Sequence, residues 1–95
     1  MKLRYTLRGA AELEMVLEYI DAQSPRGAHH VKTRIRFIID LLLQYPHAGQ
    51  LTSKGRLRRM VVSPYPYLIF YQPTEEEIII HGIRHSARRP STAPE

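Results

Sequence analysis

The stretch RRMVVSPYPYLIFYQPTEEEIIIHGIRHSARR, residues 58–89, decides the fold class of this 95-residue chain. Two runs within it, over 67–72 and 78–84, are rich in aromatic and β-branched residues, and a third strand-like run over 56–62, in which arginines are followed by Met60, Val61 and Val62, precedes them. Such residues favour strands, and the proline- and glutamate-containing segments between the runs favour turns. The stretch therefore predicts a three-stranded antiparallel meander.

Alternation predicts which way the side chains of the last strand point. It places Ile78 and Ile80 on one face and Ile79, His81 and Ile83 on the other. Apolar residues on both faces of a strand are typical of a sheet that is covered on both sides. One layer of helices covers only one face, so the other face needs long side chains or a partner protein.

The residues before the meander predict an edge strand over 2–6 and two helices. Apolar residues recur at spacings of three and four over 8–22 and again over 25–45. Ser24 and Pro25 between them are typical of a helix cap and a first helical position. Because the link between the two helices is only two or three residues long, the helices must pack antiparallel. The predicted fold class is α+β: an N-terminal edge strand, an antiparallel helical hairpin and the meander.

Length and composition predict one domain, over residues 1–90, with a loose tail over 91–95 and a loop over 47–55. The sequence contains no cysteine, which excludes disulfides and thiolate metal sites. It has no apolar run of membrane-spanning length and no secretory signal, so we expect a soluble cytoplasmic protein. The formal charge of +5 favours an anionic partner.

The sequence offers no pattern for a metal or a nucleotide cofactor, and we expect neither. His29 and His30 are adjacent, so their rings diverge by about 100° on a helix. His81 and His85 are about 13 Å apart on a strand. A glycine-rich phosphate loop is absent, and so is a pair of carboxylates spaced for acid–base catalysis.

The remaining candidate site is a cluster of basic and aromatic residues. If the meander folds as expected, its two basic ends approach one rim of the sheet. Such a rim can bind and cleave RNA, bind an acidic protein surface, or simply keep the sheet rim hydrated. The cluster comprises Lys54, Arg56, Arg58, Arg59, Arg84, His85, Arg88 and Arg89, with Tyr65, Tyr67 and Tyr71 between them.

The order of elements and several short motifs resemble the ParE branch of the RelE/ParE toxin superfamily, the toxins of plasmid-stabilisation-type toxin–antitoxin modules. The resemblance covers residues 2–90. Its motifs are Tyr5-Thr6, Leu13 with Tyr19-Ile20, Ser24-Pro25, Pro46 with Gly49, Arg59-Met60-Val61-Val62, Pro64-Tyr65-Pro66-Tyr67 with Ile69 and Tyr71, and Ile83-Arg84-His85-Ser86-Ala87-Arg88.

This resemblance implies a toxin that is neutralised by an acidic, ParD-like antitoxin in a hetero-oligomer. ParE-type toxins act on DNA gyrase, whereas RelE-type toxins cut mRNA on the ribosome. The nuclease type uses a tyrosine near the C-terminus, and no aromatic residue follows His85 here. The sequence therefore favours a gyrase inhibitor over the alternative, a ribosome-dependent mRNA endonuclease. A toxin-fold binding module without toxicity is a third reading.

Three sets of residues follow as candidate sites. An endonuclease would use Arg59, Arg84 and His85 as its catalytic residues. The antitoxin is expected to contact Met15, Tyr19, Arg58 and Arg59. The cellular target is expected to contact Arg58, Arg59, Tyr65, Tyr67, Arg84, His85 and Arg88.

Overall fold

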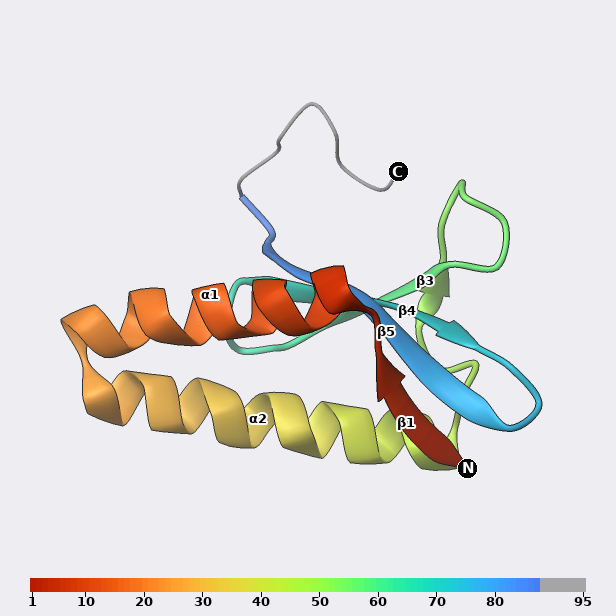
Figure 1. Ribbon diagram of the computed structural model, residues 1–95, viewed down its shortest axis with the longest axis horizontal. Helices are drawn as coiled ribbons and strands as arrows, with labels where there is room; N and C mark the ends of the chain where they lie inside the picture. Colours follow the sequence, from red (N-terminus) through yellow and green to blue (C-terminus); the bar gives the residue numbers. More distant parts are fainter. Residues whose placement is uncertain (88–95) are drawn as a thin grey trace.

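The computed structural model describes residues 1–87. Its elements follow the predicted order with one short strand added (Figure 1). Arg88 and the predicted tail over 91–95 lie outside the described residues. In chain order the elements are β1 (Lys2–Tyr5), α1 (Leu7–Gln23), α2 (Pro25–Gln44), β2 (Gln50–Leu51), β3 (Arg58–Val61), β4 (Tyr67–Pro73) and β5 (Glu77–His85).

The described strands form one mixed sheet in the order β1-β5-β4-β3-β2. β3, β4 and β5 make the predicted antiparallel meander. β1 lies at one edge, as predicted, and runs parallel to β5. A parallel neighbour requires a long crossover connection, and the chain between β1 and β5 contains both helices and strands β2–β4. The prediction of a plain loop over 47–55 is wrong, because Gln50 and Leu51 form β2 at the other edge. A strand of two residues has no periodicity from which to predict it.

Both helices begin at a residue whose side-chain hydroxyl caps the first turn, and Ser24 is the predicted one. The N–H of Gly9 donates to Thr6 Oγ1 at 2.9 Å, and the N–H of Gly27 donates to Ser24 Oγ at 3.0 Å. Ser24 also closes α1, because its N–H donates to the carbonyl of Ile20 at 2.8 Å. One residue thus ends the first helix and begins the second, so the two helices lie antiparallel (Figure 1).

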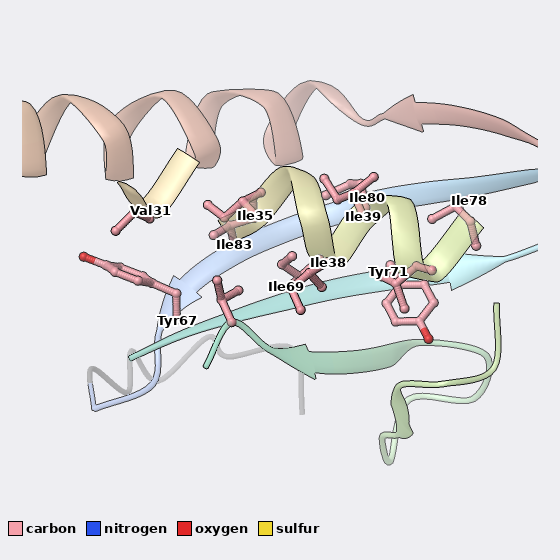
Figure 2. Close-up of a cluster of buried hydrophobic side chains, with 12 residues drawn as sticks. Val31, Ile35, Ile38, Ile39, Tyr67, Ile69, Tyr71, Ile78, Ile80 and Ile83 are labelled. Carbon is pink, nitrogen blue, oxygen red and sulfur yellow. The ribbon is translucent and has the colours of Figure 1, made fainter. Parts of the chain in front are cut away.

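The core lies between α2 and the sheet (Figure 2). α2 buries six residues, whereas α1 buries only Gly9 and packs against α2 and β5 with half-buried side chains. Burying one large apolar side chain contributes about 1.5–3 kcal/mol, so α2 is the main helical contributor to stability. The cluster comprises Val31, Ile35, Ile38, Ile39, Leu42, Val62, Tyr67, Ile69, Tyr71, Ile78, Ile80 and Ile83.

The predicted facing of Ile83 is wrong. Phe70 pairs with Gly82 and the next residue, Tyr71, pairs with Ile80, so the register skips His81. A bulge of this kind shifts the alternation by one residue. Ile83 therefore returns to the face that carries Ile80 and joins the core.

Tyr71 ties the loop after α2 to the sheet. Its hydroxyl donates to the carbonyl of Pro46 at 2.8 Å and accepts from the N–H of Gly49 at 2.8 Å. A Cβ at Gly49 would lie 2.6 Å from the Tyr71 ring and 2.8 Å from the Arg59 carbonyl oxygen, so only glycine fits there. Burial raises the pKa of Tyr71, against smaller opposing effects of the Gly49 N–H and Arg58.

Candidate functional site

A hairpin at one edge of the sheet is strongly basic. Residues 41–74 contain four basic side chains and no acidic one. We call β2, β3 and the turn over 52–57 the basic hairpin; it carries all four, Lys54, Arg56, Arg58 and Arg59. Its turn, drawn in green, extends away from the two helices (Figure 1).

The turn of the basic hairpin is held by its own hydrogen bonds. Thr52 Oγ1 donates to the carbonyl of Leu57 at 2.9 Å and accepts from the N–H of Lys54 at 3.1 Å. Gly55 has a φ of 63°, a conformation that suits glycine, and open space surrounds it. The side chains of Lys54 and Arg56 are exposed on this ordered turn.

The two arginines of β3 have different surroundings. Arg58 Nη1 donates to the carbonyls of Gly49 at 2.8 Å and His47 at 3.3 Å, so Arg58 stabilises the loop after α2. Arg59 lies opposite Phe70 in the register, on the face of the sheet away from the helices. Its Nη2 lies 3.4 Å from Gln50 Oε1. Arg58 thus serves the fold, whereas Arg59 lies half-buried on the outer face of β3.

Arg84 is taken up by a contact within the fold. Its Nη2 lies 3.3 Å from Glu12 Oε2, and its side chain is only 13% exposed. Glu12 Oε1 accepts from the N–H of Ile83 at 3.0 Å, and Oε2 also pairs with Arg8 Nε at 3.1 Å. β1 pairs with β5 only as far as Ile80, so Glu12 binds the edge of β5 where β1 has ended.

Replacing Glu12 by alanine is expected to lower the free energy of unfolding by about 2–3 kcal/mol. The change leaves the buried N–H of Ile83 without an acceptor and the mostly buried Arg84 without its counter-charge. Glu12→Gln is the matched control, because it keeps an acceptor for Ile83 and removes only the charge. Urea denaturation should rank the three proteins wild type, Gln, Ala; equal midpoints would contradict this role.

The aromatic residues of the predicted site belong mostly to the core. Tyr67 is buried, and Tyr65 is half-buried against the same cluster. The ring of His85 lies edge-on to Tyr67, with centroids 5.3 Å apart. His85 Nδ1 accepts from the N–H of Ala87 at 3.1 Å, so in the neutral ring the proton lies on Nε2.

The three residues that would form an endonuclease site do not converge. Arg59 on β3 and Arg84 on β5 are separated by β4, so their backbones are about 10 Å apart. His85 lies opposite Tyr67, which faces the helices, whereas Arg59 lies opposite Phe70 on the other face. Arg84 is engaged by Glu12. The three side chains therefore do not meet at one point in this arrangement.

The apolar part of the predicted antitoxin site lies elsewhere on the molecule. Met15 and Tyr19 are one turn apart on α1 and are 66% and 51% exposed. The residues before them, Glu14 and Glu18, are also exposed, so this patch is apolar and acidic. α1 packs along β5, two strands away from Arg59 on β3. A single segment that reaches both places has to wrap around the sheet.

One histidine lies among polar groups on the sheet face away from the helices. His81 Nε2 is 3.2 Å from Gln72 Oε1. Arg4, the cross-strand neighbour of Ile79, pairs there with Glu77 at 3.1 Å. Burial lowers the pKa of His81 below its ordinary value of 6.5, and the charge of Arg4 lowers it further. The fold therefore favours the neutral ring.

His81→Gln is expected to reduce the loss of stability on acidification. Because the folded state disfavours protonation of His81, wild-type stability is highest above pH 6.5 and falls as the pH drops through that value toward the lowered folded pKa. Glutamine retains a donor for Gln72 and does not titrate. Unfolding free energies at pH 7 and pH 5 should differ less for the variant; equal differences would refute the assignment.

Residues 1–87 contain neither a candidate metal site nor a candidate membrane-spanning helix. These residues place no three histidine, aspartate or glutamate side chains where they could hold one metal ion. They also contain no helix that is long and apolar enough to cross a membrane.

The sequence did not reveal Glu12 as the partner of Arg84, because a contact between residues so far apart leaves no local signal. Lys54 and Arg56 belong to the predicted basic cluster, but they were not among the residues predicted to contact the target.

Comparison with known proteins agrees with the fold. Residues 3–90 match the family described as ParE toxin of type II toxin-antitoxin system, parDE. The chain is 37% identical to Toxin RelE2 of Caulobacter vibrioides over 84 residues, 88% of this chain and 93% of that protein. It is 30% identical to Putative toxin Y4kP of Sinorhizobium fredii over 79 residues, 83% of this chain and 82% of that protein.

A solved structure has the same fold at low sequence identity. The match is to a chain of the chromosomal ParDE TA system from P. aeruginosa, with a TM-score of 0.76 and 20% identity. It covers 90% of this chain and 95% of that one. The family match over residues 3–90 and the two relatives together identify the chain as a member of the ParE toxin family of type II toxin–antitoxin systems.

Proposed function

We propose that this toxin acts in the cytoplasm by binding DNA gyrase and that it cuts no nucleic acid itself. The observation that carries the proposal is the separation of Arg59, Arg84 and His85 across two faces of the sheet. General acid–base catalysis needs its groups within hydrogen-bond reach of one reacting atom. Inhibition by binding needs only a complementary surface. Membership of the ParE family supports the same choice of target.

The surface proposed for the target comprises the basic hairpin together with Tyr65, which follows the far end of β3, and His85 at the end of β5. Lys54 and Arg56 are exposed on its turn, and Arg59 follows on β3. Tyr65 and His85 are half-buried and keep part of their surface for contact. Arg58, Tyr67 and Arg84 support this surface from within, and Arg88 remains a predicted contact.

We also propose that the antitoxin wraps around the sheet. Its acidic residues would meet Arg59, beside Val61, which is 53% exposed. Within residues 1–87 no strand pairs with Met60 or Val61 on the side where β2 ends, so an extended segment can add there. The part that reaches Met15 and Tyr19 has to be apolar, because Glu14 and Glu18 repel acidic residues. Crossing the 30 Å intermediate dimension takes roughly ten extended residues.

Induction of the toxin without its antitoxin tests the proposal in cells. We expect growth arrest, accumulation of relaxed plasmid topoisomers and intact transcripts in primer extension. His85→Ala should remain toxic, because no catalytic step depends on it. Codon-phased cuts in translated mRNA together with a harmless His85→Ala variant would reject gyrase inhibition.

The alternative function is a ribosome-dependent mRNA endonuclease that uses Arg59, Arg84 and His85. The observation that favours it is the name of one relative, Toxin RelE2. In this alternative Arg84 has to leave Glu12 when the toxin binds the ribosome, so Glu12→Gln should raise the cleavage rate. The same primer-extension experiment separates the two functions.

A further inference from the structure

We propose that the basic hairpin binds the phosphate backbone of duplex DNA, so that the toxin contacts DNA as well as protein in the gyrase complex. The DNA contact within the gyrase complex rests on the proposed function, because gyrase is the proposed target. Binding of duplex DNA by the basic hairpin can be measured without gyrase.

The charges of the hairpin support a phosphate ligand. No acidic residue occurs between Asp40 and Glu75, and Lys54 and Arg56 have no ion-pair partner within residues 1–87. They contrast with Arg84, whose charge is balanced by Glu12. Two exposed cations on a turn held by Thr52 keep their positions when an anion approaches. Ion pairing therefore requires little ordering of the backbone.

The side chains of the turn suit DNA better than an acidic protein. Between Thr52 and Arg56 the hairpin offers a hydroxyl, an ammonium, a glycine and a guanidinium, and no apolar side chain. Protein interfaces depend on buried aromatic and apolar anchors at their centre, whereas phosphate contacts use Lys, Arg, Ser, Thr and backbone N–H groups. Two exposed large apolar residues belong to the hairpin, Leu51 directly before the turn and Val61 at the far end of β3.

The shape of the hairpin favours duplex DNA over RNA. β2 and β3 form one edge of the five-stranded sheet, and their turn over 52–57 is a narrow hairpin end with open space at Gly55. The major groove of B-DNA admits a two-stranded ribbon, whereas the major groove of duplex RNA is deep and too narrow for side chains to enter. The turn can therefore contact phosphates on both sides of a DNA groove.

The salt dependence gives the number of contacts. Lys54 and Arg56 together should release about two counterions, and Arg59 raises this to about three. The affinity for a labelled 20-base-pair duplex should then fall roughly 10- to 40-fold between 50 and 200 mM salt. Fluorescence anisotropy with the purified full-length toxin measures this slope directly.

Charge reversal of the turn tests where the DNA binds. Lys54→Glu/Arg56→Glu is expected to weaken duplex binding at least about tenfold at 50 mM salt and to remove most of the salt dependence. Arg26→Glu/Lys32→Glu on α2 is the matched control, because both residues are exposed and the change in net charge is the same. The control should bind within about threefold of wild type. Lys54→Gln/Arg56→Gln should fall between the two.

The possible results separate the two claims. Equal weakening by both reversed variants, or tighter hairpin-dependent binding to single-stranded RNA of the same length, would overturn the proposal. A toxin that binds duplex DNA through the hairpin but leaves supercoiling unaffected would refute gyrase inhibition and retain the DNA site. Inhibition of supercoiling that the reversed hairpin leaves unchanged would refute the DNA contact in the complex and retain gyrase as the target.

Discussion

Replacing Tyr71 by alanine is expected to lower the free energy of unfolding by about 3–5 kcal/mol, the largest effect of any single substitution considered for stability. Tyr71 is fully buried and belongs to the core cluster, near Ile78 (Figure 2). The change removes the ring, and it also removes the partner of the Gly49 N–H and the Pro46 carbonyl. Domains of this size are stabilised by only about 5–15 kcal/mol, so the variant is expected to be marginal at 37 °C.

Tyr71→Phe separates the hydroxyl from the ring. It keeps the packing but leaves one donor and one acceptor of the loop unsatisfied, which costs about 1–3 kcal/mol. Urea denaturation with a common slope measures both variants. If Tyr71→Phe were as stable as wild type, the loop over 46–49 would be held by something other than this hydroxyl.

Arg59→Glu is expected to weaken the antitoxin complex by about 2–5 kcal/mol, roughly 30- to several-thousandfold in Kd. The substitution places a carboxylate against the acidic segment that we propose to cover β3. Arg58→Glu should also weaken the complex, but Arg58 donates to the carbonyls of Gly49 and His47, so its reversal destabilises the toxin as well. Arg59 therefore gives the clearer measurement.

The control for Arg59→Glu is Arg26→Glu, an exposed arginine at the start of α2. It makes the same change in charge away from β3, and it should leave the affinity within about threefold of wild type, because exposed charges contribute little. Calorimetric titration of each toxin with antitoxin provides the comparison. Unchanged affinity for Arg59→Glu would refute the placement of the acidic segment on β3.

Local patterns in the sequence predicted the elements well, because caps and strand composition act over a few residues. Ser24 begins the second helix as expected, and Tyr67, Ile69 and Tyr71 alternate along β4 so that all three face the core. The edge position of the first strand was also predicted. Its parallel pairing with β5 and the two-residue strand β2 were not, because both depend on tertiary contacts.

Non-local contacts explain the remaining differences. The bulge at His81 turns Ile83 into the core, which alternation alone cannot reveal. Glu12 accepts a hydrogen bond from Ile83, 71 positions away, and pairs with Arg84 beside it. The basic residues that the sequence groups together therefore differ in the structure. Arg58 and Arg84 make contacts that stabilise the fold, whereas Lys54 and Arg56 are exposed on the hairpin turn.

The most direct test of the toxin's action is a supercoiling assay with purified gyrase, relaxed plasmid, ATP and stoichiometric amounts of toxin. Negative supercoiling is expected to stop as the toxin is added and to resume when the antitoxin is supplied, and His85→Ala toxin should inhibit as well as wild type. Full supercoiling in the presence of excess folded toxin would contradict gyrase inhibition.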